Sequence, residues 1–230
     1  MTMLSDRLGV LEDTAPWNVT GSVARVTASE VEVRGMRLRI GDTLTIKGRT
    51  TTGLAEVIAL TPDGARVLLF GDTDGIGKGD PVVVDDEALS MLISEALVGR
   101  ILDGLGRPID GGPPLDGEPI GVNAPAPDPL GRVRITEAMP TGVKLIDTFC
   151  TTGKGQRVGI FGGSGVGKST LLGMMARGTG ADVAVLALIG ERGREVREFI
   201  EDELGPEGMS RAILVVATSD QPPLMRLRAS

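Results

Sequence analysis

The feature that most constrains the fold of this chain is a glycine-rich stretch, residues 162–169, with the sequence GGSGVGKS. It fits the pattern G-x-x-x-x-G-K-[ST] at every fixed position, and it lies between an apolar run, residues 158–161, and a helix-like run, residues 170–177. The glycines allow the backbone to curl until several N–H groups point at one anion, and the following helix directs its positive end at the same anion. This context predicts a phosphate-binding loop at the start of a parallel α/β sheet.

The polar residues of this phosphate loop have separate expected roles. Lys168 is expected to reach the β- and γ-phosphates of a nucleotide, and the hydroxyl of Ser169 is expected to hold Mg²⁺. The alternative is a glycine-rich turn that matches by chance, which the strand-helix context disfavours. The predicted nucleotide-binding residues are Gly162, Gly163, Ser164, Gly165, Val166, Gly167, Lys168, Ser169 and Thr170.

Composition excludes several classes of chemistry. The chain has no histidine, which excludes imidazole catalysis and histidine-ligated metal sites, and its single cysteine, Cys150, cannot form an internal disulfide. Aromatic residues make up only 2%, so the core must be aliphatic. The net charge of −7 disfavours binding to nucleic acid or to acidic lipid surfaces. Since there is no secretory signal and no run of about 18 apolar residues, the expected location is cytoplasmic.

The chain up to about residue 90 has the pattern of a small β-domain. Short alternating or apolar runs are separated by Gly and Asp, which is typical of a small closed barrel or sandwich, and a closed barrel also removes exposed edge strands. The expected domains are an N-terminal segment at 1–18, a β-barrel at 19–90 and a nucleotide-binding domain at 91–230. The expected strands are residues 19–26, 31–33, 36–40, 43–47, 54–60, 66–70 and 81–84.

The middle of the chain, residues 94–140, is rich in Gly and Pro. On composition alone it is interpreted as a long linker that wraps a domain, because each residue before a proline avoids the helical region.

From residue 142 the pattern changes to α/β. Apolar runs at 157–161, 183–189 and 212–217 predict buried strands, and residues 170–177 predict the helix after the phosphate loop. Residues 195–204 predict a second helix, with Val196, Phe199, Ile200 and Leu204 on one face, ended by Gly205 and Pro206. The order strand-helix-strand-helix-strand predicts a parallel sheet with right-handed crossovers.

A second polar group, residues 190–195 with the sequence GERGRE, follows the second of these strands. Ligands bind at the carboxyl ends of strands in parallel sheets, so a carboxylate here can activate a water for attack on a phosphate, and a guanidinium can offset phosphate charge. The alternative is a charged helix start with Glu/Arg pairs at helical spacing, and charge pattern alone favours that alternative.

Three stretches resemble a family of hexameric ATPases that includes the rotary ATP synthase catalytic subunit and the type III secretion and flagellar export ATPases. Residues 195–200, 205–208 and 217–220 resemble the flagellar export ATPase most, with the virulence type III ATPase close behind. The resemblance is firm over residues 99–230 and loose over the barrel. The three stretches are residues 99–111 (GRILDGLGRPIDG), residues 141–147 (TGVKLID) leading to 155–157, and the phosphate loop with residues 190–195.

The resemblance implies a RecA-like P-loop NTPase fold, incomplete at its C-terminal end, behind a small β-barrel. By matched position, the resemblance implies that Lys168 would contact the phosphates and that Glu191 would activate the attacking water. It also implies that Arg192 would lie beside the γ-phosphate and that Glu195 would touch the water shell of Mg²⁺. The implied cofactors are ATP and Mg²⁺. The implied function is an ATPase that drives flagellar or type III protein export as a homo-hexamer, with residues 94–140 as a hairpin and an extended wrap.

The resemblance also implies partners: stalk proteins, regulators of the export apparatus, chaperones and export substrates, with peripheral attachment to the membrane through the export gate and no nucleic acid. The family continues with an Asp-terminated strand, an arginine finger and a C-terminal helical domain, whereas this sequence ends at Ser230. It is therefore expected to be a C-terminally truncated member that binds nucleotide weakly and hydrolyses little by itself.

Three alternatives remain open at this point. A rotary synthase subunit is disfavoured by Gly193 and by residues 197–199, and an RNA-translocating helicase is disfavoured by the 2% aromatic content and the acidic balance. A non-catalytic assembly module is the third, and it would enter mixed rings and lower their ATPase activity.

Overall fold

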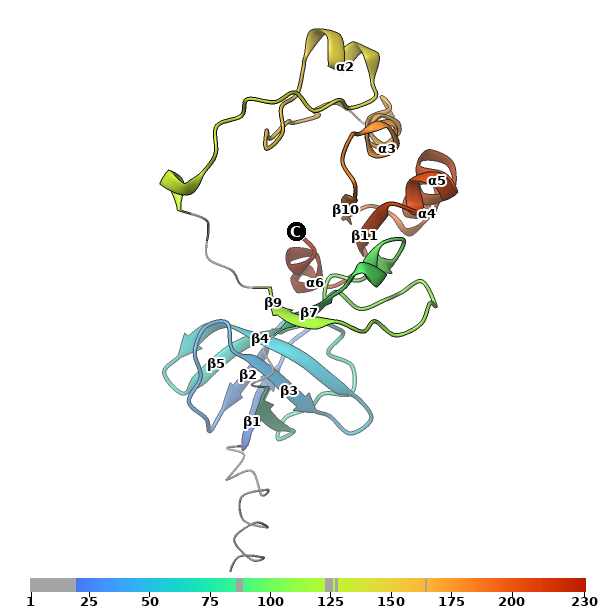
Figure 1. The fold of residues 1–230 in the computed structure, drawn as a ribbon. Coiled ribbons are helices and arrows are strands. Elements are labelled where there is room, and N and C mark those ends of the chain that lie inside the picture. The colour runs from blue at the N-terminus through green and yellow to red at the C-terminus, as the bar shows by residue number, and fades with distance from the viewer. Residues whose placement is uncertain (1–19, 86–88, 123–125, 127, 164) are drawn as a thin grey trace, which may run out of the picture. The chain divides into compact units, whose positions relative to one another are not determined.

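The computed structural model describes residues 20–85, 89–122, 126, 128–163 and 165–230. The chain divides into two compact units, residues 1–88 and residues 89–230 (Figure 1). The expected N-terminal segment at 1–18, Val19 and Ser164 lie outside the described residues.

The first unit is a closed antiparallel barrel with the strand order β1-β2-β5-β4-β3-β6. Its centre is filled by aliphatic side chains that alternate with outward-facing residues along each strand, as the lack of aromatic residues requires. The strands are β1 (Thr20–Val26), β2 (Val31–Arg34), β3 (Thr43–Lys47), β4 (Thr52–Thr61), β5 (Gly64–Leu69) and β6 (Pro81–Val84).

One predicted strand of the barrel is wrong. Residues 36–40 form the turn between β2 and β3, in which the backbone N–H of Arg39 donates to Asp42 Oδ2 at 2.7 Å. Met36 and Leu38 still pack against the barrel core, while Ile40 is 68% exposed. The alternating pattern therefore predicts inward packing at Met36 and Leu38 only, and in the described part of the chain residues 36–40 pair with no strand.

The second unit contains a three-stranded parallel sheet with the order β10-β11-β8 and a two-stranded antiparallel sheet, β7-β9. Its strands are β7 (Ser90–Ile93), β8 (Ile101–Leu102), β9 (Glu118–Gly121), β10 (Ala184–Ile189) and β11 (Ala212–Ala217). Its helical segments are η1 (Glu95–Leu97), η2 (Pro129–Gly131), α2 (Lys144–Phe149), α3 (Lys168–Gly178), α4 (Gly193–Glu198), η3 (Phe199–Leu204), α5 (Gly205–Met209) and α6 (Pro223–Arg228).

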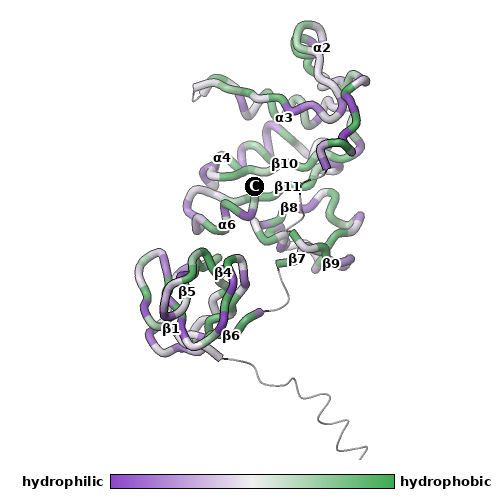
Figure 2. Tube along the Cα trace, turned by 90° about the vertical axis from the view of Figure 1, so that its left-hand side faces the viewer, coloured by the Kyte–Doolittle hydropathy of each residue, from purple (hydrophilic) through white to green (hydrophobic). Residues whose placement is uncertain are grey.

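The core of this unit lies between the parallel sheet and the segments α3, α4 and η3. Figure 2 shows the hydrophobic residues that run along β10 and β11, which pair in register from Ala184 with Ala212 to Ile189 with Ala217. The predicted face of the second helix is confirmed, since Val196, Phe199 and Leu204 are buried and Ile200 packs beside them. The helix ends at Leu204 as predicted, but its second half, η3, is a π-helix.

The predicted strand at residues 157–161 is not formed. This segment joins no sheet among the described residues, and Phe161 is 95% exposed. An apolar run predicts extended backbone, but a strand also requires a neighbour whose N–H and C=O groups complete the ladder. The phosphate loop here therefore follows a segment without regular secondary structure and not a paired strand.

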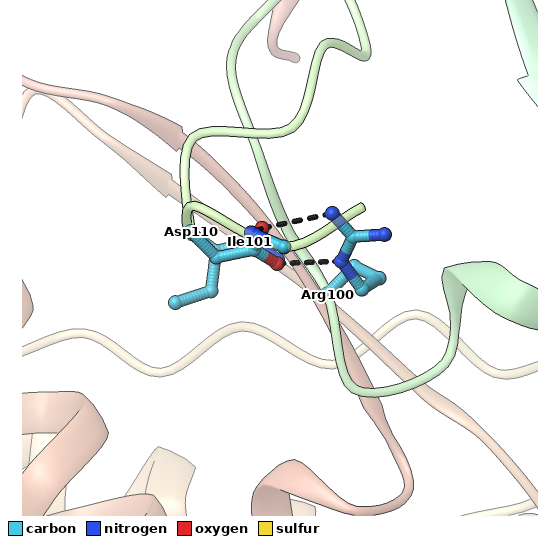
Figure 3. A network of polar contacts seen from close by, with 4 residues as sticks. Arg100, Ile101 and Asp110 are labelled. Atoms are coloured by element: carbon cyan, nitrogen blue, oxygen red, sulfur yellow. Dashed lines mark hydrogen bonds and ion pairs between the residues drawn. The ribbon is translucent and has the colours of Figure 1, made fainter. Parts of the chain in front are cut away.

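The first part of residues 94–140, which composition alone interprets as a linker, belongs to the two sheets of the second unit. Within this stretch β8 pairs in parallel with β11, and β9 pairs with β7. Asp110 accepts hydrogen bonds from Arg100 Nε at 2.7 Å and Nη2 at 2.8 Å, and from the backbone N–H groups of Ile101 at 3.0 Å and Gly112 at 2.9 Å (Figure 3). In this ion pair the side chain of Arg100 is 12% exposed and that of Asp110 is 15% exposed. The pair holds the loop after β8 against the edge strand of the parallel sheet.

Asp110→Asn is expected to destabilise the second unit by about 1–3 kcal/mol, because a charge-assisted pair is lost and an amide donor faces the guanidinium. The hydrogen bond from Arg100 holds the pKa of Asp110 well below its usual range. The contribution of ionised Asp110 to the free energy of unfolding is thus complete above about pH 4, where the carboxyl group is also ionised in the unfolded chain. This contribution declines as the pH falls further. Urea midpoints of the wild type and the variant should converge below about pH 4.

The matched control is Asp116→Asn, which alters an exposed carboxylate in the same Gly/Pro-rich stretch. A difference between the wild type and Asp110→Asn that persists unchanged to pH 2 would contradict the assignment of the ion pair as the source of the stability.

None of the helices in the described ranges is long and apolar enough to cross a membrane.

Candidate active site

The phosphate loop has the backbone that its glycines are needed for. Gly165 has φ +74° and Gly167 has φ +90°, a left-handed region that side-chain-bearing residues rarely adopt. Gly167 is the N-cap of α3, which begins at Lys168. The described loop residues before Lys168 are exposed, so the loop presents its backbone to solvent at the start of the helix.

Lys168 folds back over this loop. Its Nζ donates to the carbonyl oxygen of Gly162 at 2.8 Å and to that of Gly163. An ammonium group has three donors, so one N–H remains for an anion while the other two hold the side chain in place.

The two residues after Lys168 differ in their surroundings. The side chain of Ser169 is exposed, in keeping with a hydroxyl available to a ligand. The hydroxyl of Thr170 instead donates to Glu203 Oε1 at 2.6 Å. Sequence reasoning missed Glu203, because the contact joins residues 33 positions apart and η3 carries several carboxylates that look alike in the sequence.

Glu191 follows the carboxyl end of β10, as predicted. Gly190, with φ +77°, donates its N–H to the carbonyl of Ala217 at 2.7 Å, and the carbonyl of Glu191 accepts from the N–H of Ser219 at 3.0 Å. The backbone of Glu191 is therefore tied to the end of β11, while its carboxylate side chain is exposed. Sequence reasoning did not identify Ser219 as a support for Glu191.

Arg192 and Glu195 form the start of α4. Arg192 Nη1 donates to Glu195 Oε1 at 2.7 Å, and Glu195 also accepts from the backbone N–H of Arg192 in a capping box. The side-chain hydrogen bond from Arg192 is the main cause that lowers the pKa of Glu195. The structure thus brings Arg192 and Glu195 into contact at the start of α4, directly after Glu191 in the chain.

The structure shows no direct polar contact between the described polar residues after the phosphate loop glycines and the polar residues at the start of α4. Among the described residues, no hydrogen bond or ion pair links Lys168, Ser169 or Thr170 with Glu191, Arg192 or Glu195. The same part of the chain holds no cluster of three or more carboxylate, thiol or imidazole side chains that would bind a metal ion.

The residues present fit a magnesium-bound nucleotide. The left-handed glycines leave backbone N–H groups free to meet phosphate oxygens, Lys168 has a donor to spare, and Ser169 offers an exposed hydroxyl. Mg²⁺ keeps several waters and is commonly bound by one or two protein groups plus substrate phosphates, and the hydroxyl of Ser169 is one group of this kind.

Both units match models of one family. Residues 23–84 match the ATP synthase alpha/beta family, beta-barrel domain, and residues 142–230 match the nucleotide-binding domain of the same family. Together the two matches cover more than half of the chain. The chain belongs to the ATP synthase alpha/beta family. A β-barrel followed by the family's nucleotide-binding domain is the fold class that the sequence predicts, and it is confirmed.

Within the ATP synthase alpha/beta family, the chain is similar to export ATPases. It is 44% identical over 224 residues to the flagellum-specific ATP synthase of Bacillus subtilis, covering 96% of this chain and 51% of that protein. It is 44% identical over 213 residues to the type 3 secretion system ATPase of Xanthomonas euvesicatoria, covering 91% of this chain and 48% of that protein. The chain spans about half the length of these curated relatives, and its resemblance to the flagellar and type III ATPases is confirmed.

A solved structure shares both the fold and the sequence. The assembled ATPase EscN from the type III secretion system of enteropathogenic E. coli superimposes with a TM-score of 0.81 and 41% identity, over 91% of this chain and 50% of EscN. EscN has also been solved in complex with its central stalk EscO, with the same TM-score.

Proposed function

We propose that this chain binds Mg-ATP and belongs to an ATPase that drives flagellar or type III protein export. The observation that carries this proposal is the 44% identity, over 224 residues, to a flagellum-specific ATP synthase. It is supported by a phosphate loop with left-handed glycines at Gly165 and Gly167 and a lysine poised over it.

The proposed division of labour follows the two polar groups. Residues 162–170 bind the phosphates, with Lys168 neutralising their charge and Ser169 as the protein ligand of Mg²⁺. Bound Mg²⁺ would offset charge on the phosphate oxygens during hydrolysis. Glu191 orients and activates the attacking water, and Arg192 offsets charge at the γ-phosphate. Glu195 holds Arg192 through the 2.7 Å hydrogen bond and would contact the water shell of a bound Mg²⁺.

The proposed assembly is a homo-hexameric ring at the cytoplasmic face of the membrane. The relative EscN is an assembled ATPase that binds a central stalk protein, and we extend that arrangement to this chain. Further proposed partners are regulators of the export apparatus, chaperones, export substrates and the export gate, through which the ring would be attached to the membrane.

The test uses the purified chain with a fluorescent ATP analogue, with and without Mg²⁺, together with phosphate release and light scattering. The ATP analogue is expected to bind saturably and in an Mg²⁺-dependent way. ATP is also expected to increase the particle mass measured by light scattering, as ring assembly requires. Absence of saturable binding would refute the proposal. Binding and assembly without phosphate release would instead support the non-catalytic assembly module.

A further inference from the structure

We infer that Glu203 acts as a latch on the nucleotide site: it holds the hydroxyl of Thr170 and thereby lowers the affinity of the phosphate loop for nucleotide. This inference rests on the proposed nucleotide binding at residues 162–170. It assigns a role to a carboxylate outside both polar groups that the sequence singled out.

The contact is a strong hydrogen bond at the first turn of the loop helix. Thr170 is the third residue of α3, and its Oγ1 lies 2.6 Å from Glu203 Oε1 on η3. A hydroxyl donating to a carboxylate at this distance is a charge-assisted hydrogen bond, which is roughly twice as strong as one between neutral groups.

Backbone packing fixes this contact in place. On α3, Gly173 lies three residues after Thr170 and therefore on the same face of the helix. A Cβ added at Gly173 would lie 2.9 Å from both the Cβ and the carbonyl oxygen of Glu203. The two helical segments therefore approach closely at Glu203, beside the fully buried side chain of Leu204. Packing of the two segments thus places the backbone of Glu203 next to α3, within reach of the Thr170 hydroxyl.

The hydroxyl of Thr170 can donate to Glu203 or to a phosphate, but not to both at once. Thr170 has one O–H donor, and both a carboxylate and a phosphate oxygen are acceptors. While Thr170 donates to Glu203 it cannot donate to a phosphate, so binding of a phosphate at Thr170 must break the 2.6 Å hydrogen bond. The carboxylate also repels a nearby phosphate through its charge. Both effects oppose nucleotide binding.

The π-helical form of η3 is consistent with a functional position. The segment Phe199–Leu204 is a π-helix that directly continues α4, which begins at the proposed catalytic group. Single π-helical turns inside α-helices occur frequently at functional sites.

The experiment measures the Kd of a fluorescent ATP analogue in the presence of Mg²⁺ for the wild type, Glu203→Ala and Glu203→Gln. Freeing Thr170 to donate to a phosphate is expected to lower the Kd about tenfold in Glu203→Ala, the effect of one charge-assisted hydrogen bond. Glu203→Gln keeps an acceptor but removes the charge, so its Kd should fall between those of the wild type and Glu203→Ala.

Two further variants separate the latch from general effects. Glu201→Ala removes a carboxylate from the same segment, one that pairs with Arg197 Nε at 2.7 Å, and should leave the Kd unchanged. In a Thr170→Val background the hydroxyl is gone, so adding Glu203→Ala should have no further effect on the Kd, as a double-mutant cycle requires. A role in stability alone would give weaker binding in Glu203→Ala, in parallel with a lower melting temperature.

The latch is overturned if Glu203→Ala binds as the wild type does or more weakly, or if its effect survives in the Thr170→Val background. These outcomes are distinct from failure of the proposed function, in which the wild type shows no saturable binding or Lys168→Ala binds as the wild type does.

Discussion

Replacing Lys168 by alanine is expected to raise the Kd for Mg-ATP by about 100-fold or more and to abolish hydrolysis. The ammonium is the only side-chain cation within the phosphate loop, residues 162–169, and two hydrogen bonds to Gly162 and Gly163 hold it there. Loss of its charge removes a charge-assisted hydrogen bond and leaves the phosphates without a side-chain cation from the loop. Equilibrium binding of a fluorescent ATP analogue measures the effect.

Lys154→Ala is the matched control for Lys168→Ala. Lys154 is also a lysine of the second unit, but its Nζ pairs with Glu137 Oε2 at 2.6 Å at an exposed position. Its loss should leave both the Kd and the phosphate-release rate unchanged. Equal binding by the Lys168→Ala variant and the wild type would show that the loop does not bind nucleotide through Lys168.

The elements that the sequence predicts best are those with a strong local pattern. The strands β10 and β11 are continuous apolar runs, and the second helix has a regular apolar face that is buried as expected. The need for glycine in the phosphate loop is clear at Gly165 and Gly167, whose φ angles of +74° and +90° are ones that other residues avoid.

The elements that the sequence predicts poorly depend on partners far along the chain. The strand β8 has only two residues, is surrounded by Gly and Pro, and exists because β11, more than a hundred residues later, pairs with it. Conversely, residues 157–161 have a strand-like pattern but no pairing partner among the described residues. Pairing is a property of two segments, so a pattern in one of them cannot establish it.

The same limit applies to the site. Glu203 is one of several carboxylates between residues 195 and 207, and its contact with Thr170 arises only when η3 packs against α3. The alternative of a charged helix start predicts Glu/Arg pairs at helical spacing, and Arg192 with Glu195, three residues apart, is such a pair. Local spacing therefore predicts contacts within one helix, such as Arg192 with Glu195, whereas tertiary packing determines contacts such as Thr170 with Glu203.

Glu191→Gln is expected to separate nucleotide binding from hydrolysis. Glutamine has nearly the same size, and the carbonyl of residue 191 still accepts from Ser219, so the backbone at the end of β10 should not change. The amide cannot accept a proton from the attacking water, so the phosphate-release rate should fall about 10²- to 10⁴-fold while the Kd for Mg-ATP stays within about twofold.

The control for Glu191→Gln is Glu198→Gln, an exposed carboxylate at the end of α4 whose loss changes the net charge equally. Both variants are compared with the wild type by phosphate release under single-turnover conditions, in which product release does not limit the rate. If Glu191 serves only as part of a charged helix start, both variants should hydrolyse ATP equally well. A rate loss confined to Glu191→Gln, at unchanged affinity, is the result that a water-activating carboxylate requires, because such a group acts in the transition state and adds nothing to ground-state binding.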